Sequence, residues 1–145
     1  IVESVMMVCE PRASRKDIRI LATVQPDAVA FVNQPLMEQA LLNLVENAVK
    51  YTDQGGHVDV AASVVDGRLT LSVSDDGCGI PREHLPRIFE RFYRVDKGRS
   101  RSQGGTGLGL SIVRHVATIH GGKVRVTSEP GVGSQFVIDV PAIQG

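Results

Sequence analysis

Apolar residues recur at helical spacing in three parts of the chain, and this pattern predicts three helices. The predicted helices cover residues 2–14, about 34–51 and 107–120. Asn33 can cap the second of them, and Pro35 falls in its first turn, where a missing N–H costs nothing. We also expect a short helical piece over residues 84–92.

Apolar and polar residues alternate in several further segments, as they do in strands that bury one face. The predicted strands are residues 18–24, 28–32, 58–64, 69–73, 123–127 and 134–140. Asp66-Gly67 separates two of these runs, which is a strong signal for a β-hairpin. Because most of the strands are joined as hairpins and not through helices, the sequence predicts a mixed sheet of about five strands with the helices packed on one face.

Length and composition are those of one globular domain. The chain has 145 residues, of which 42% are hydrophobic and 22% are charged, so it can bury a core. Lysine and arginine balance aspartate and glutamate at 16 each, and we therefore expect no nucleic-acid partner. No apolar run is long enough to span a membrane, so we expect no direct membrane contact.

Cys9 and Cys78 are the only cysteines in the sequence, which suits a reducing, cytoplasmic setting without a metal cluster. Ile1 opens the chain in place of a methionine, so we expect a single domain cut from a longer protein. As a fragment, this domain is expected to be monomeric.

The stretch QGGTGLGLSI, residues 103–112, places glycines at alternate positions ahead of the third predicted helix. No lysine follows them, which excludes a P-loop, and no strand leads into them, which excludes a dinucleotide-binding fingerprint. Glycines before a helix N-terminus still allow backbone N–H groups to approach a phosphate closely. A flexible linker is the alternative on these residues alone.

Polar residues form a stripe on the second predicted helix. Asn43, Glu46, Asn47 and Lys50 lie one turn apart on one face within LLNLVENAVKYT. Asparagine is a poor choice for a solvated helix face, whereas amide oxygens one turn apart suit Mg²⁺ and a lysine beyond them suits phosphate. An ordinary solvated face is the alternative.

Asp75 ends a predicted strand and is followed by Gly77 and Gly79. A carboxylate in this place can accept a hydrogen bond from an exocyclic amino group such as that of adenine. The two glycines would admit a flat ring against the backbone. A tight turn capped by aspartate is the alternative.

Taken in order, five motifs resemble those of the ATP-binding catalytic domain of bacterial sensor histidine kinases, in the Bergerat superfamily of gyrase, heat-shock chaperone, kinase and MutL ATPases. NLVENAVKYT is similar to the N box, DDGCGIP to the first glycine box and RIFERFYRVD to the F box. GGTGLGLSIV is similar to the second glycine box, and PGVGSQF to the closing segment. The resemblance covers nearly the whole chain and implies an α/β (α+β) two-layer sandwich, the Bergerat fold, that binds ATP with Mg²⁺ and leaves ADP as product.

The resemblance also implies a role for each matching residue. Asn47, with Asn43, would coordinate Mg²⁺, and Lys50 would contact phosphate. Asp75 would accept the adenine amino group, with Ser134 supporting it through its hydroxyl or a water molecule. The other residues expected around the nucleotide are Tyr51, Gly77, Gly79, Ile80, Gly105, Gly107, Leu108, Gly109 and Leu110.

Residues from about 82 to 105 would form a mobile ATP lid, which Phe89 and Phe92 of the F box would anchor to the domain. Arg94, or Arg91, would reach the γ-phosphate as a catalytic residue. For both arginines, a solvated charge on the lid is the alternative.

One position separates kinases from hydrolases within the superfamily. ATPases of the gyrase and chaperone branches carry a water-activating glutamate where this chain has Asn43, which cannot accept a proton at neutral pH. Glu46 instead lies where sensor kinases carry a catalytic acidic residue that assists the phosphoacceptor imidazole. The resemblance therefore implies transfer of the γ-phosphoryl group to histidine with little hydrolysis of ATP.

None of the four histidines in the sequence has the acceptor pattern, so the hairpin that carries the acceptor is expected before Ile1. The implied partners are this dimerisation and phosphoacceptor domain of the same parent protein and a downstream response regulator, with the parent anchored to the inner membrane. Two alternatives stay open: a non-catalytic nucleotide-sensing module, and an anti-sigma-type serine kinase of the same fold.

Overall fold

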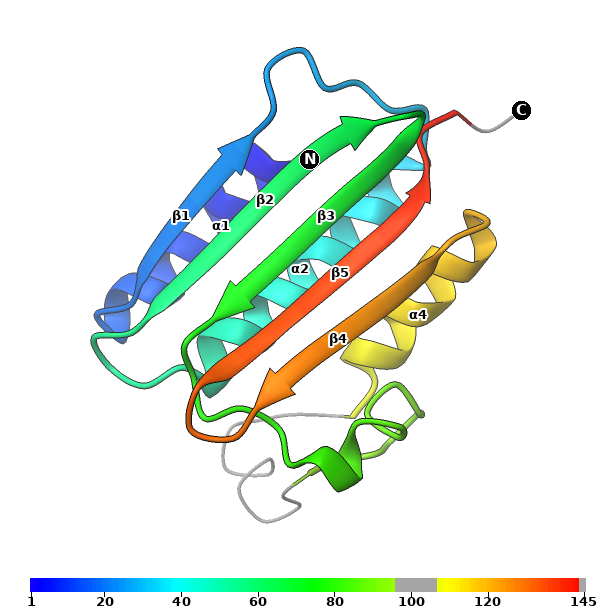
Figure 1. The fold of residues 1–145 in the computed structure, drawn as a ribbon. Coiled ribbons are helices and arrows are strands. Elements are labelled where there is room, and N and C mark those ends of the chain that lie inside the picture. The colour runs from blue at the N-terminus through cyan, green and yellow to red at the C-terminus, as the bar shows by residue number, and fades with distance from the viewer. Residues whose placement is uncertain (96–106, 144–145) are drawn as a thin grey trace.

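The computed structural model of the chain describes residues 1–95 and 107–143. Within them, one mixed sheet has five strands in the order β1-β2-β3-β5-β4 (Figure 1). β1 pairs with β2 in parallel, and the other neighbouring pairs are antiparallel, which confirms the predicted mixed sheet. The strands are β1 Arg19–Val24, β2 His57–Val65, β3 Arg68–Asp75, β4 Lys123–Glu129 and β5 Gly133–Pro141.

Three α-helices cover one face of the sheet and form the second layer (Figure 1). They are α1 Val2–Arg15, α2 Gln34–Tyr51 and α4 Gly109–Ile119, and a short 3-10 helix, η1, spans Arg82–His84. Asn33 caps α2 as the sequence predicts, because its side-chain oxygen accepts a 3.1 Å hydrogen bond from the N–H of Leu36. None of the helices in the described part of the chain is long and apolar enough to cross a membrane. The predicted two-layer sandwich is confirmed.

The hydrophobic core lies between the two layers. Val58 and Val60 of β2 and Leu71 and Val73 of β3 alternate along their strands toward the helices, and all four are almost completely buried. α2 lies between α1 and α4 and buries Met37, Ala40, Leu41, Leu44, Val45, Ala48 and Val49. Each large apolar side chain buried in this way contributes about 1.5–3 kcal/mol. The core therefore fixes α2, and with it the polar stripe on the same helix.

The hairpin at Asp66-Gly67 forms as predicted. Both turn residues have positive φ, 52° at Asp66 and 73° at Gly67, as a two-residue hairpin turn of type I′ requires. The turn pairs Val65 with Arg68, and the same register continues to the other end of the hairpin, where Val58 lies opposite Asp75.

The predicted strand over residues 28–32 is wrong. Pro26 and Asp27 turn the chain at the edge of the sheet, and the segment then crosses to the start of α2 instead of running beside β1. Within this segment, the N–H of Phe31 donates a 2.7 Å hydrogen bond to the carbonyl of Ala142.

The predicted helix over residues 84–92 is also wrong. This segment contains the end of η1 followed by turns. Pro86 has no N–H with which to continue a helical ladder, and Phe92 has a φ of 66°, outside the helical region. The third predicted helix starts at Gly109 and not at Gly107, because Gly107 has a φ of 78°.

Candidate functional site

One end of the sandwich gathers most of the residues that the sequence predicts for the site. There the loop after β3 lies against the C-terminal end of α2, because the N–H of Cys78 donates to the carbonyl of Tyr51 at 3.3 Å. The same loop is held to the turn before β5 by a 2.8 Å bond from Gly131 to the carbonyl of Cys78. The side chain of Asn43 joins α2 to the start of α4 through the carbonyl of Gly109 at 3.2 Å. Motifs that are far apart in the sequence therefore meet here.

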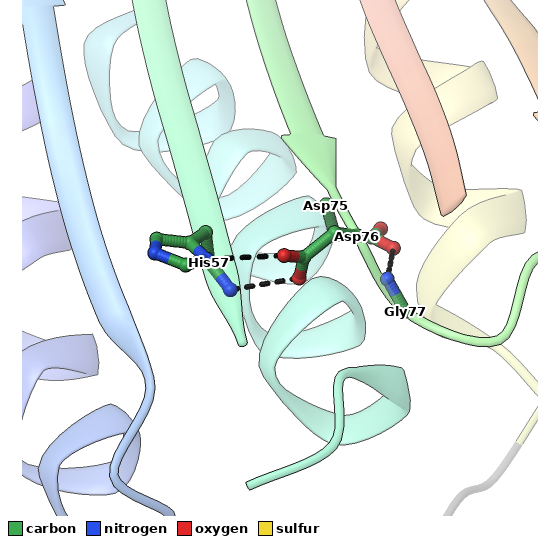
Figure 2. Close-up of polar contacts among 4 residues, drawn as sticks. All are labelled: His57, Asp75, Asp76 and Gly77. Carbon is green, nitrogen blue, oxygen red and sulfur yellow. Dashed lines mark hydrogen bonds and ion pairs between the residues drawn. The ribbon is translucent and has the colours of Figure 1, made fainter. Parts of the chain in front are cut away.

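Asp75 is the last residue of β3 (Figure 2), and its carboxylate is partly buried. It accepts a 2.9 Å hydrogen bond from the N–H of Gly77 and another from the backbone N–H of Ser134. Burial raises the pKa of Asp75; the two backbone hydrogen bonds oppose this rise, and the charge of Asp76 adds to it. The hydroxyl of Ser134, for which the sequence predicts a supporting role directly or through a water molecule, lies 2.7 Å from the hydroxyl of Ser128.

Asp76 points away from Asp75, toward the start of β2 (Figure 2). Its carboxylate accepts a 2.7 Å hydrogen bond from the backbone N–H of His57 and lies 3.0 Å from Nδ1 of the same residue. The backbone N–H of His57, together with the imidazole, lowers the pKa of Asp76. The sequence patterns predict no role for either residue at the site, although the register of the Asp66-Gly67 hairpin brings them together.

Glycines at the site allow close packing of the protein's own backbone. A Cβ at Gly77 would lie 2.4 Å from the carbonyl oxygen of Tyr51, and one at Gly79 would lie 2.2 Å from that of Glu129. A Cβ at Gly107 would lie 2.7 Å from Cα of Phe92. These positions require glycine before any ligand is considered. Gly109 differs, since a Cβ there would meet nothing within 4 Å.

The two asparagines of the α2 stripe have different surroundings. Asn43 is fully engaged: its amide oxygen accepts a 2.7 Å bond from Gln39, and its amide nitrogen donates to Gly109. The side chain of Asn47 has no hydrogen-bond partner among residues 1–95 and 107–143. Asn47 is thus the asparagine whose amide oxygen is available to a ligand.

Two charged residues of the stripe lie on either side of Asn47 in sequence. Lys50 places its ammonium group 5.3 Å from the ring centroid of Tyr51, within the range of a cation–π contact. Glu46 turns toward α1, where its carboxylate forms a 2.7 Å ion pair with Arg12. Glu46 and Asn43 therefore face the two helices that flank α2 and do not share one surface.

The F-box segment is attached to the domain through Ile88, which is buried in the core, and through contacts of the two phenylalanines. Phe89 packs edge-to-face on Phe136 of β5, with ring centroids 6.1 Å apart. Phe92 does not anchor the segment through its side chain, which is 68% exposed; instead its N–H donates to the carbonyl of Gly107 at 2.8 Å. The expected role of Phe92 is corrected to a backbone contact.

The remaining predicted residues differ in their surroundings. Ile80 donates its N–H to the hydroxyl of Ser128 at 2.7 Å, and Leu110 packs against the core. Leu108 precedes α4, and its carbonyl accepts a 2.7 Å bond from the hydroxyl of Ser111. Arg94 is partly buried, whereas Arg91 is exposed. Gly105, with the part of the predicted lid from 96 to 105, lies outside the described residues.

The chemistry of this donor set fits a nucleotide. Asp75 offers a partly buried carboxylate whose pKa is raised. A hydrogen-bond donor such as an amino group would stabilise the ionised form of this carboxylate. The described residues contain no group of three or more His, Cys, Asp or Glu side chains that could hold a metal ion by themselves. A magnesium ion here would need amide and phosphate oxygens, which suits Asn47 and a bound triphosphate.

An aspartate at a strand end, an asparagine on a facing helix and a glycine-flanked turn, set at one end of a two-layer sandwich, are typical of a nucleotide-binding ATPase module. A family model described as histidine kinase-, DNA gyrase B-, and HSP90-like ATPase matches residues 32–144. The chain belongs to this family, and it is an ATPase domain homologous to the sensor histidine kinases of two-component systems.

Two curated relatives illustrate the similarity. The chain is 46% identical over 109 residues to the sensor-like histidine kinase SenX3 of Mycolicibacterium smegmatis. The matched region covers 75% of this chain and 28% of that protein. It is 42% identical over 120 residues to the sensor histidine kinase YkoH of Bacillus subtilis, covering 83% of this chain and 26% of that protein. The chain spans less than a third of the length of these relatives.

Solved structures show the same fold. The nucleotide-free catalytic domain of histidine kinase ThkA matches with a TM-score of 0.85 at 26% identity, over 98% of this chain and 90% of that one. Full-length ShkA in complex with AMPPNP matches with a TM-score of 0.83 at 37% identity, over 96% of this chain and 28% of that one.

Proposed function

We propose that residues 1–145 form a catalytic domain that binds Mg-ATP and donates the γ-phosphoryl group to a histidine on a separate dimerisation domain of the same parent protein. The observation that supports this most strongly is that the glycine-flanked turn after Asp75 lies against Tyr51 at the end of α2, one helical turn beyond Asn47. Membership in the histidine kinase-like ATPase family agrees with it.

Asp75 recognises adenine in this proposal. An ionised carboxylate offers about four lone-pair directions, so two backbone donors leave room for the amino group of the base. Gly77, Gly79 and Ile80 would border the ring on one side, and Tyr51 would line the pocket at the end of α2.

Asn47 is the proposed protein ligand of Mg²⁺. Asn43 remains a candidate helper, but its amide oxygen already accepts a bond from Gln39, so its main role is to hold Gly109 against α2. Bound Mg²⁺ would neutralise charge on the phosphates and keep most of its other ligands as water and phosphate oxygens. Lys50 would contact the phosphates, which Gly105, Gly107 and Gly109, with Leu108 and Leu110 beside them, would enclose at the start of α4.

The transfer step would depend mainly on positioning and on neutralising charge. Arg94 would contact the γ-phosphate, and Glu46 would orient the acceptor imidazole. In the free domain, Glu46 is paired with Arg12, so docking of the acceptor would have to open this pair or share it. Asn43 offers no base for activating water, and we therefore propose little hydrolysis of ATP.

A response regulator is the proposed partner that receives the phosphoryl group from the acceptor histidine. Histidine kinase ThkA, whose catalytic domain resembles this chain, has been solved in complex with the response regulator protein TrrA. This partner and the supply of ATP place the domain in the cytoplasm in this proposal, within a parent protein anchored to the inner membrane.

Calorimetry with Mg-ATP tests the binding step, with Asp75→Asn as the variant that should lose affinity. The transfer step is tested by adding the acceptor hairpin of the parent protein and looking for acid-labile phosphohistidine. If the wild-type domain hydrolyses ATP steadily and Glu46→Gln abolishes this hydrolysis, the kinase mechanism is contradicted. ATP binding without any phosphotransfer would favour the nucleotide-sensing module, and acid-stable phosphoserine on a partner would favour the serine kinase.

A further inference from the structure

The residue after Asp75 is bound three times to a single residue of the neighbouring strand. Asp76 donates its N–H to the carbonyl of His57 at 3.3 Å, and its carboxylate accepts the N–H of His57 at 2.7 Å. The other carboxylate oxygen lies 3.0 Å from Nδ1 of the imidazole (Figure 2). We call these two residues the His57–Asp76 clamp. It joins the first residue of β2 to the residue that follows β3.

Two glycines lie close to the clamp and its backbone, while the side chains of His57 and Asp76 are about half exposed. A Cβ at Gly56 would lie 2.8 Å from Oδ1 of Asp76, so the residue before His57 leaves just enough space for the carboxylate. On the other side, a Cβ at Gly133 would lie 2.0 Å from the carbonyl oxygen of Asp75 and 3.0 Å from Cα of Asp76. The peptide between Asp75 and Asp76 is therefore held between the starts of β2 and β5.

The orientation of Asp75 depends on that of Asp76. Successive side chains of an extended strand point to opposite faces, and the two carboxylates do so here (Figure 2). While His57 holds Asp76 on one side, Asp75 stays on the other side, beside the N–H of Gly77. The clamp also keeps the charge of Asp76 directed away from Asp75, whose ionised form that charge disfavours.

We propose that His57 is a positioning residue for adenine recognition: by clamping Asp76, it aims the carboxylate of Asp75 at the amino group of the base. The inference rests on the proposed function, because it assumes that Asp75 receives adenine. Among the described residues, the clamp forms no hydrogen bond or ion pair with Asn47, Lys50 or the start of α4, so losing it affects recognition of the base and leaves the contacts to phosphate in place.

The test compares two nucleotides that differ at the edge of the base that Asp75 is proposed to recognise. Inosine triphosphate carries a carbonyl where ATP carries the amino group, and an N1–H where ATP has an accepting N1, so the ratio of the two dissociation constants reports on recognition of this edge. Calorimetry on this chain with Mg²⁺ gives both constants. The variants are His57→Ala, which removes the side-chain bond, and His57→Asn, whose amide nitrogen can replace Nδ1. Arg68→Ala is the matched control, because Arg68 forms a 2.7 Å ion pair with Asp139 at the opposite end of β3.

We expect His57→Ala to raise the dissociation constant of Mg-ATP about three- to tenfold, the effect of one hydrogen bond, and that of Mg-ITP less than about twofold. His57→Asn should restore the ratio, and Arg68→Ala should leave it unchanged. Equal weakening of both nucleotides, or an ATP affinity within about twofold of wild type, would overturn the inference. If the wild-type chain binds no Mg-ATP, the proposed function is overturned as well. If Asp75→Asn abolishes binding of Mg-ATP but His57→Ala leaves it intact, only the inference is overturned.

Discussion

The side-chain nitrogen of Asn43 donates a 3.2 Å hydrogen bond to the carbonyl of Gly109, so the middle of α2 is joined to the first residue of α4. Asn43→Ala should lower the free energy of unfolding by about 0.5–1.5 kcal/mol, and it should loosen the first turn of α4. Urea unfolding and hydrogen exchange in α4 measure the two effects. Gln39→Ala is the control, since it removes only the outer hydrogen bond to Asn43. Unchanged exchange in Asn43→Ala would show that this bond does not hold α4.

Asp75→Asn should separate nucleotide binding from stability. The raised pKa of Asp75 means that its ionised form is less favourable in the folded protein than in the unfolded chain. The amide keeps an oxygen for the N–H of Gly77 but carries no charge, so we expect an equal or higher Tm at neutral pH. Binding of Mg-ATP should weaken by about 10- to 100-fold, because a charged hydrogen-bond acceptor is lost. A large drop in Tm would instead assign Asp75 a mainly structural role.

Acidification should change affinity and stability in opposite directions at Asp75. Burial raises the pKa of this carboxyl from 3.8, so it takes up its proton earlier than an ordinary aspartate. Its contribution to stability is complete below the pKa of the unfolded chain and is lost as the pH rises through the higher pKa of the folded state. Protonation removes the charge that binds the amino group, so affinity for Mg-ATP should fall over the same range. Calorimetry and thermal melts on the acidic side of neutrality measure both trends, and Asp75→Asn should lack them.

Gly107 and Gly109 should respond differently to alanine. Gly107 has a φ of 78° and has Phe92 against it, so Gly107→Ala should cost about 1–3 kcal/mol of stability. Gly109 lies in the first turn of α4 with open space around it, and Gly109→Ala should leave the unfolding free energy within about 1 kcal/mol of wild type. Lower affinity for Mg-ATP in a stable Gly109→Ala protein would support direct contact with the phosphates. Wild-type affinity would argue against such contact.

Cys78 offers a chemical probe of the site. It is exposed between Gly77 and Gly79, whereas Cys9 is buried, and burial raises the pKa of the Cys9 thiol to about 11. Iodoacetamide should therefore modify Cys78 and leave Cys9 unmodified. Mg-ATP at about ten times its dissociation constant should slow this reaction about tenfold if the base covers the loop. An unchanged rate, measured by mass spectrometry, would place the nucleotide elsewhere.

Local sequence signals predicted the elements whose determinants are local. The Asn33 cap, the Asp66-Gly67 turn and the alternation around it depend on residues within a few positions of each other, and all are present in the structure. The predictions for residues 28–32 and 84–92 were wrong although the apolar periodicity is present in both segments. The first segment connects the edge of the sheet to α2, and a proline interrupts the second.

The sequence predicts which residues belong to the candidate site, but it does not predict the contacts that their side chains make. Composition cannot show that Glu46 faces Arg12 while Asn43 faces Gly109, because this depends on how three helices pack side by side. The pairing of His57 with Asp76 was accessible, since a two-residue turn fixes the register of the whole hairpin.

Ala142 donates a 2.8 Å hydrogen bond to the carbonyl of Gly67, so the last described residues lie beside the hairpin turn. Gly67 and Asp75 stand at opposite ends of β3, about 25 Å apart for a strand of this length. An affinity tag or a sensor-chip linker attached at the C-terminus would therefore leave the opposite pole unobstructed, and binding could be followed on the immobilised protein.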